Sequence, residues 1–181
     1  YEDVLIPTMV EIGDRWQAGT LSISEEHVAS ALVHRLIGRL GSQFARRGVK
    51  RGAIIIGAPV GDFHSLPTAL VADLLRGRGF EVIDLGANTP GESFARVATS
   101  TGRLVAIGLA VSAPLDRSDP RGTIADIRSA ELGVPIVVGG GQVSSAAEGE
   151  ALGADFASTD ADEFLAIIDD LADQSPSAAV G

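Results

Sequence analysis

The sequence predicts an α/β protein in which a helical segment precedes a doubly wound sheet of five parallel strands. Two patterns predict this fold. Before residue 48, apolar residues recur at helical spacing. After residue 52, short apolar runs alternate with helical patterns, which is typical of parallel strands covered by helices on both faces. We therefore expect a helical cap, part of a bundle, over residues 1–48, a sheet domain over 52–175 and a disordered tail over 176–181.

The helical cap is predicted to hold two helices, the first of them weakened around Trp16 by the glycines at 13 and 19. The second begins near Ser22, because Ser22 with Glu25 three residues later is a capping-box signature, and ends near Gly48. Two helices alone make a poor core, so we expect them to pack on further helices, on the sheet domain or on another subunit. The chain begins at Tyr1 rather than Met, which suggests that it belongs to a longer protein.

The sheet domain is predicted to alternate strand and helix throughout. The expected strands are 53–58, 80–85, 104–110, 134–138 and, more weakly, 154–157. The expected helices are 67–78, 91–100, 118–131, 142–152 and 161–173. Ligands bind such sheets outside the carboxyl ends of the strands, where the strand order reverses. The loop after the first strand is therefore the first place to look for a site.

Composition excludes several kinds of chemistry. Cysteine is absent, which excludes disulfides, thiolate catalysis and cysteine-based zinc sites. The net charge of −10 argues against nucleic-acid binding by this chain. The basic run 46–51 is interpreted as a solvated connector between domains, and a binding patch is the alternative. No apolar stretch is long enough to span a bilayer and no signal peptide is present, so we expect a cytoplasmic protein with no membrane partner.

Common catalytic motifs are also missing. The sequence has no Walker-type phosphate loop, and no G-x-G-x-x-G follows the first strand. The acidic pair that phosphoreceiver domains carry after their first strand is not in place either. No nucleophile–base pair stands out, so we expect a binding protein rather than an enzyme.

The loop after the first strand carries a candidate metal ligand. Asp62 precedes His64 by two residues, directly after a buried apolar run. A histidine that binds a metal is neutral at the ligating nitrogen, and its other ring nitrogen usually donates to a carboxylate. Asp62 is close enough in sequence to accept that hydrogen bond. The pair therefore predicts a ligand for a large metal cofactor.

The segment Asp62-x-His64-x-x-Pro67 resembles the D-x-H-x-x-G motif of the cobalamin-binding Rossmann-like domains found in methionine synthase, mutases, corrinoid carriers and photoreceptors. The resemblance implies that His64 displaces the dimethylbenzimidazole base and becomes the lower axial ligand of cobalt. Asp62 and Ser65 would belong to the same cofactor-binding loop. Pro67 stands where the family has glycine, but proline is acceptable in the first turn of a helix.

Two further family elements follow in order. At the end of the third strand the family has S-x-L, and the spacing here puts Ala110 and Ser112 at those positions, so that the Ser112 hydroxyl could still reach the displaced base. Gly139, Gly140 and Gly141 match the family's Gly-Gly pair, where missing side chains let a ligand approach the backbone. A plain strand end and ordinary strand-end glycines are the alternatives. Together the three elements extend the resemblance over the sheet domain.

The helical cap carries a more specific resemblance. Trp16 is followed by Glu26 and His27 at the spacing W-x9-E-H, which resembles the CarH/LitR-type photoreceptors that bind adenosylcobalamin. The resemblance implies that Trp16 packs over the adenosyl group, that Glu26 accepts hydrogen bonds from its ribose or adenine, and that His27 forms a wall of the cavity. The alternatives are Trp16 as a core anchor and the other two as ordinary first-turn residues.

The resemblance implies a light sensor. Light would cleave the cobalt–carbon bond, the helical cap would shift, and homo-oligomerisation or partner contacts would change. DNA would be bound only through a domain outside this chain. The alternative is a corrinoid carrier for methyl transfer, although the caps of such carriers commonly place Phe or Leu over the upper face and lack the Glu-His pair. A domain of the same fold that binds another ligand is a third possibility.

Overall fold

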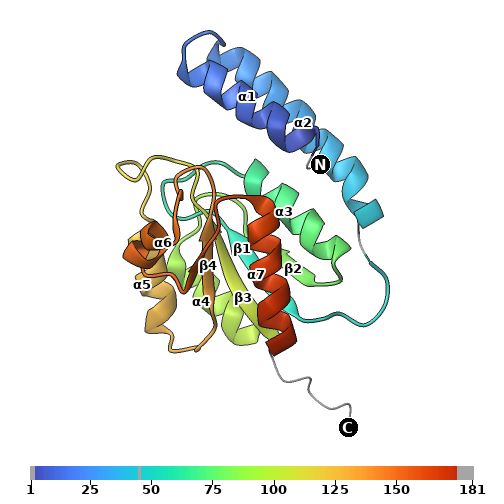
Figure 1. The fold of residues 1–181 in the computed structure, drawn as a ribbon, viewed down its shortest axis with the longest axis vertical. Coiled ribbons are helices and arrows are strands. Elements are labelled where there is room, and N and C mark those ends of the chain that lie inside the picture. The colour runs from blue at the N-terminus through green and yellow to red at the C-terminus, as the bar shows by residue number, and fades with distance from the viewer. Residues whose placement is uncertain (1–2, 45, 175–181) are drawn as a thin grey trace. The chain divides into compact units, whose positions relative to one another are not determined.

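The computed structural model describes residues 3–44 and 46–174, so the predicted disordered tail over 176–181 lies outside the described residues. The chain divides into two compact units, residues 1–45 and residues 46–181. The first is helical and the second contains the sheet (Figure 1).

The helical unit is an antiparallel hairpin of α1 (Leu5–Gln17) and α2 (Ile23–Phe44) (Figure 1). The predicted capping box is confirmed, because the Ser22 N–H donates to the Glu25 carboxylate at 2.9 Å and the Glu25 N–H donates to the Ser22 hydroxyl at 3.3 Å. Helix α1 continues past Gly13, since one glycine costs a helix only about 1 kcal/mol. The last described helical residue of α2 is Phe44, and Gly48 lies beyond it.

The helical unit has little core of its own. No residue of α1 is buried. Several large apolar side chains of the two helices are exposed: Val10, Ile23, Val28, Leu32 and Leu36. Val33 and Ile37 of α2 are buried, so the buried apolar side chains described in the hairpin come from α2.

The second unit is built on five parallel strands in the order β2-β1-β3-β4-β5. The strands are β1 (Ala53–Gly57), β2 (Glu81–Asp84), β3 (Leu104–Ala110), β4 (Ile136–Gly139) and β5 (Phe156–Ala157). This is the flavodoxin-like order of a Rossmann-like doubly wound sheet, and it confirms the predicted fold class. The order reverses between β1 and β3, so the loops after these two strands flank the switch point.

Helices cover both faces of the sheet (Figure 1). On one face lie α3 (Leu66–Gly77) and α7 (Ala161–Gln174), and on the other lie α4 (Gly91–Ser100), α5 (Pro120–Ser129) and α6 (Ala146–Leu152). Successive residues of β1 serve the two faces alternately: Ile54 and Ile56 pack towards α3 and α7, and Ile55 packs towards the other three helices. Each face therefore has its own buried apolar cluster.

Some predicted boundaries were wrong by two to four residues. Helix α5 begins at Pro120 rather than at 118, because Asp119 caps it by accepting a hydrogen bond from the Gly122 N–H at 2.8 Å. Helix α6 begins at Ala146 rather than at 142, behind its cap Ser145. Strand β4 begins at Ile136 rather than at 134, directly after Pro135, which has no N–H for a ladder.

The basic run 46–51 is only in part the solvated connector that the sequence predicts. Arg51 forms ion pairs with Asp169 and with Asp173 of α7, the second at 2.8 Å, and its guanidinium lies 4.8 Å from the centre of the Phe80 ring. Arg78 also pairs with Asp169, at 2.8 Å. Within the sheet unit, Arg51 thus anchors the start of β1 to α7.

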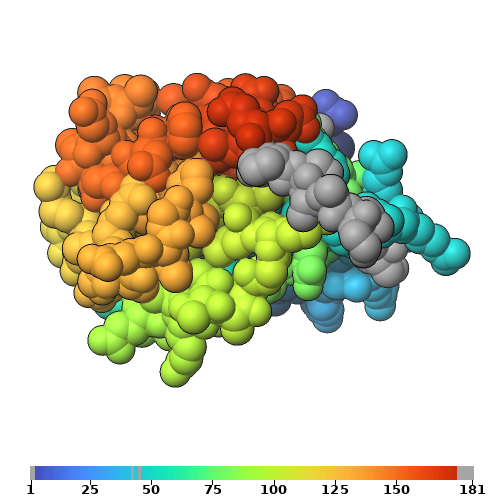
Figure 2. All heavy atoms as spheres, turned by 90° about the horizontal axis from the view of Figure 1, so that it is seen from below, coloured from blue at the N-terminus to red at the C-terminus, as the bar shows by residue number. Residues whose placement is uncertain are grey.

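Figure 2 views the molecule from below, where atoms from the α4, α5 and α7 segments, coloured green, orange and red, form much of the surface of the sheet unit. Across the described ranges 3–44 and 46–174, no helix combines the length and the apolar character that crossing a membrane requires.

Candidate functional site

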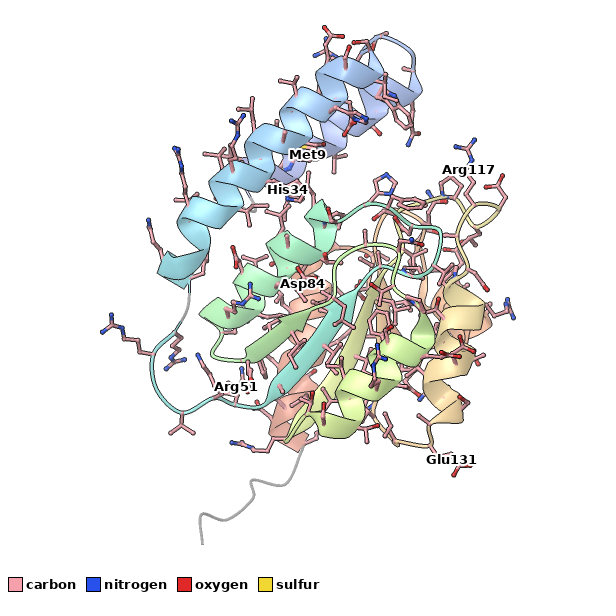
Figure 3. All side chains as sticks on the ribbon, turned by 180° about the vertical axis from the view of Figure 1, so that it is seen from behind. Met9, His34, Arg51, Asp84, Arg117 and Glu131 are labelled. Carbon is pink, nitrogen blue, oxygen red and sulfur yellow. The ribbon has the colours of Figure 1, made fainter. Side chains whose placement is uncertain are left out.

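The carboxyl edge of the sheet carries the loop that follows β1, and Figure 3 marks this edge by Arg117 and the opposite, amino edge by Glu131. Neighbouring loops hold this loop through its backbone. The carbonyl of Val60 accepts from the Asp119 N–H at 2.8 Å, and the carbonyl of Asp62 accepts from the Asn88 N–H at 2.7 Å. The loop is therefore fixed by the chain after β2 and by the start of α5.

Asp62 connects the two loops at the switch point. Its side chain is fully buried, and one carboxylate oxygen accepts from the N–H groups of Ser112 at 2.6 Å and Ala113 at 2.8 Å, both in the loop after β3. The other oxygen accepts from the His64 N–H at 3.0 Å and lies 2.7 Å from Nδ1 of the His64 ring. The His64 side chain is 54% exposed. A buried carboxylate thus orients an imidazole that reaches the surface.

The charge of Asp62 is stabilised by these contacts. Burial alone would raise the pKa of Asp62, but the hydrogen bonds from the His64 side chain and from the N–H groups of Ala113, His64 and Ser112 outweigh it and lower that pKa below its ordinary value. Asp62 is therefore an ionised acceptor at neutral pH. A neutral His64 that donates from Nδ1 to this carboxylate carries its lone pair on Nε2, the form that ligates a metal.

The residues before α3 accommodate the departure from the D-x-H-x-x-G motif. Ser65 precedes the helix, and its carbonyl accepts from the Thr68 hydroxyl at 2.9 Å. Pro67 lies in the first turn of α3, where a missing N–H breaks no helical hydrogen bond. Pro67 therefore leaves the backbone around His64 intact.

The three glycines after β4 differ in what surrounds them. A Cβ added at Gly139 would lie 2.4 Å from the Ser158 hydroxyl oxygen, and one at Gly140, whose φ is +110°, would lie 2.6 Å from the Val111 carbonyl oxygen. At Gly141 an added Cβ would meet nothing within 4 Å. The first two glycines are thus required by packing, and only Gly141 borders open space. The Ser112 backbone N–H already serves Asp62, whereas the role expected for its hydroxyl stays a prediction.

The three candidate residues of the helical unit lie at one end of the hairpin. Trp16 is in the last turn of α1, Glu26 is in the first turn of α2, and His27 directly follows it. The Glu26 carboxylate accepts from the Ser30 hydroxyl at 2.5 Å and lies 2.5 Å from Nδ1 of His27. Trp16 is 40% exposed, so it is not a buried anchor of the hairpin. The structure therefore groups an aromatic face with a carboxylate–imidazole pair.

Sequence reasoning missed the residues that brace the His64 loop. The Gly61 N–H donates to the Asn88 side-chain oxygen at 2.9 Å, and the Val60 N–H faces the Thr123 hydroxyl at 3.4 Å. Asn88 has a φ of 51° and lies in the turn-forming run Gly-Ala-Asn-Thr-Pro. That run predicts a turn, but not its contact with Gly61, which lies 27 residues earlier in the chain.

The residues at this edge fit a large cobalt-containing cofactor such as a corrinoid. The His64 imidazole is partly exposed, and its Nδ1 lies next to the buried, ionised carboxylate of Asp62. Metal-binding histidines commonly have such a carboxylate partner. Exposed apolar side chains of the same loops, Val60, Phe63 and Leu115, offer a surface that a flat macrocycle would cover. After β4, a Cβ added at Gly141 would meet nothing within 4 Å, so this part of the chain is open to a ligand.

Comparison with protein families gives the class of protein. The family model for the B12-binding domain matches residues 52–168, and a second model, also described as a B12-binding domain, matches residues 1–40. The chain belongs to the B12-binding domain family, and its cofactor is a cobalamin or a related corrinoid. The resemblance predicted from the sequence is thereby confirmed.

Individual relatives place the chain more closely. It is 31% identical over 147 residues to the HTH-type transcriptional repressor CarH of Myxococcus xanthus, covering 80% of this chain and 48% of that protein. It is 32% identical over 89 residues to trimethylamine corrinoid protein 1 of Methanosarcina mazei, covering 48% of this chain and 41% of that protein. The chain spans about half the length of these relatives. None of them is named as an enzyme, in agreement with the predicted binding role.

Solved structures share the fold. The monomethylamine corrinoid protein of Methanosarcina barkeri superimposes with a TM-score of 0.72 at 22% identity, over 88% of this chain and 76% of that one. A cobalamin-binding protein of Desulfitobacterium hafniense gives a TM-score of 0.60 at 23% identity, over 90% of this chain and 77% of that one. At such identities the likeness shows the fold alone.

Proposed function

We propose that this chain is the light-sensing part of a regulator and that it binds adenosylcobalamin with Nε2 of His64 as the lower axial ligand of cobalt. The observation that carries the ligation is the buried Asp62, which holds Nδ1 of an exposed imidazole at the switch point of the sheet. Ser65, Ser112 and the glycines at 139–141 would line the path of the displaced base.

The helical unit would provide the cover of the upper ligand. Trp16 offers an aromatic face to the adenosyl group, and Glu26 offers a carboxylate to its hydroxyl or amine donors. When bound, adenosylcobalamin supplies the light-sensitive cobalt–carbon bond. Loss of the adenosyl group would remove the contacts that favour one arrangement of the helices, and a ligand shifts an equilibrium only through such differential contacts.

The regulatory output would be a change in homo-oligomerisation. DNA would be bound by a part of the protein outside this chain, since a net charge of −10 disfavours contact with phosphates. A cytoplasmic location follows from this proposed role in transcription.

A corrinoid carrier for methyl transfer is the alternative function. The M. mazei corrinoid protein is as similar in identity as the repressor, and the residues around His64 would serve either role. The similarity to the repressor covers 80% of the chain, more than the whole sheet unit, so it extends into the helical unit. The similarity to the corrinoid protein covers 48%. This difference favours the sensor.

The test is the absorbance spectrum of the chain reconstituted with adenosylcobalamin in the dark, before and after a green flash. The sensor predicts a base-off dark spectrum that converts irreversibly, and His64→Ala should abolish the histidine-ligated form. His34→Ala, on α2, is the matched control and should keep the wild-type spectrum. Binding without a response to light would favour the carrier. Absence of corrinoid binding would contradict both functions.

A further inference from the structure

We propose that Asn88 is a positioning residue for His64: it holds the loop after β1 in the conformation in which Asp62 reaches both the loop after β3 and the imidazole. The inference rests on the proposed ligation of cobalt by His64. It assigns a role to a residue of the loop after β2, which carries none of the motif residues.

Asn88 bonds to two consecutive residues of the His64 loop. Its side-chain oxygen accepts from the Gly61 N–H at 2.9 Å, and its own N–H donates to the Asp62 carbonyl at 2.7 Å. The second bond is made by the residue whose carboxylate orients His64. Asn88 therefore acts on the backbone of Asp62 itself, and only one residue separates Asp62 from the proposed ligand.

Apart from the N–H groups of Ser112 and Ala113, which bind the Asp62 carboxylate, the braces from other loops act further from Asp62. Asp119 and Thr123 both contact Val60, and the Thr123 contact is long at 3.4 Å. The Asp62 N–H is satisfied within the loop, by the Pro59 carbonyl at 3.0 Å. Removing the Asn88 side-chain acceptor would leave Val60 in place and take the bond from the Gly61 N–H, next to Asp62, while the backbone N–H of residue 88 still reaches the Asp62 carbonyl.

The backbone conformation explains why this position suits asparagine. Asn88 has a φ of 51°, in the left-handed region, where asparagine is several-fold enriched among residues other than glycine. Gly61, its partner, has a φ of +83°, and a Cβ there would lie 2.2 Å from the Arg117 carbonyl oxygen. Gly61 cannot be replaced without strain, so the bond between the two residues is best tested by changing Asn88.

Three substitutions separate the acceptor from the backbone conformation. Asn88→Asp keeps a side-chain acceptor and tolerates the left-handed region. Asn88→Gly keeps the conformation and removes the acceptor. Asn88→Ala removes the acceptor and strains the backbone. The matched control is Glu131→Gly, because Glu131 has a φ of 52° and lies at the opposite edge of the sheet (Figure 3).

The experiment measures the state of His64 with and without cofactor. In the cofactor-free chain, ¹⁵N NMR of the imidazole reports the fraction of His64 protonated at Nδ1. In the chain loaded with aquacobalamin, absorbance and, after reduction, the nitrogen hyperfine splitting in electron paramagnetic resonance report the fraction with histidine bound to cobalt.

Asn88→Gly should lower the equilibrium constant for histidine ligation about three- to ten-fold, the effect of losing roughly one hydrogen bond. It should also lower the Nδ1-protonated fraction. Asn88→Ala should lower both further, whereas Asn88→Asp and Glu131→Gly should keep wild-type values.

A loss of thermal stability in Asn88→Gly with unchanged tautomer and unchanged ligation would overturn the inference and leave Asn88 a purely structural residue. Equal effects of Asn88→Gly and Glu131→Gly would do the same. If the wild-type chain binds no corrinoid, the proposed function fails, and the tautomer measurement still decides whether Asn88 positions His64.

Discussion

The two units of the chain differ in how they stabilise their candidate site residues. In the sheet unit, His64 is held by Asp62, whose carboxylate is fully buried and bonded to two loops. In the helical unit, Trp16 and His27 lie on the exposed surface of a hairpin in which α1 buries no residue. The proposed lower ligand is thus preorganised, whereas the proposed upper cover lies on a hairpin in which one helix buries no residue.

This difference suits a switch. A ligand most readily changes the arrangement of elements whose own stability is low. The sheet unit would retain the corrinoid while the helical unit responds to its upper ligand.

Core truncation should affect the two units very unequally. Phe94 is completely buried in the sheet unit, so Phe94→Ala should lower the free energy of unfolding by about 3–5 kcal/mol. Leu32 of α2 is 49% exposed, and Leu32→Ala should cost less than about 1 kcal/mol.

Urea unfolding checks both: circular dichroism follows the whole chain, and fluorescence of Trp16, the single tryptophan, follows the helical unit. A cost above about 2 kcal/mol for Leu32→Ala would contradict the exposed position of that helix face.

Asp62→Asn should affect stability and ligation together. The change removes a charged acceptor and places an NH₂ group where two N–H donors converge, so the unfolding free energy should fall by about 2–4 kcal/mol. Histidine ligation should weaken about 10- to 100-fold, as for other partners of metal-binding histidines. Asp73→Asn is the control, since Asp73 is also buried but pairs with Arg76. It should lower stability and leave ligation unchanged; a comparable loss of ligation would show that Asp62 has no specific role.

Acid should destabilise the sheet unit through Asp62. Its pKa in the folded chain lies below the ordinary value of about 3.9 expected in the unfolded chain. Its contribution is therefore fully present above the unfolded pKa and is lost as the pH falls through the folded pKa. The unfolding free energy of the wild type, measured from pH 7 to pH 3, should fall more steeply than that of Asp62→Asn. Parallel curves would mean that Asp62 is not an ionised acceptor in the folded chain.

The site features that the sequence predicted are those formed by residues close together in the chain. Asp62 and His64 are two residues apart, and a strand followed by a turn is enough to bring a carboxylate to an imidazole. The capping box at Ser22 is equally local. Asn88 could not be found in this way, because its bond to Gly61 depends on how β1 and β2 pair and on the exact path of two loops. The starts of α5 and α6 were predicted wrongly. The capping residues Asp119 and Ser145, and not the spacing of apolar residues, determine where these two helices begin.

Removing the indole of Trp16 should separate function from stability in the helical unit. Because Trp16 is 40% exposed in a helix without buried residues, Trp16→Ala should change the unfolding free energy by less than about 1 kcal/mol. Under the proposed function it should still impair the dark stability of bound adenosylcobalamin or the response to light, measured from the absorbance change per flash. Trp16→Phe is the matched variant, which retains an aromatic face and should retain most of the response. A large loss of stability in Trp16→Ala would reveal a packing role for the indole. Unchanged photochemistry in a stable Trp16→Ala chain would contradict the role of Trp16 as a cover of the upper ligand.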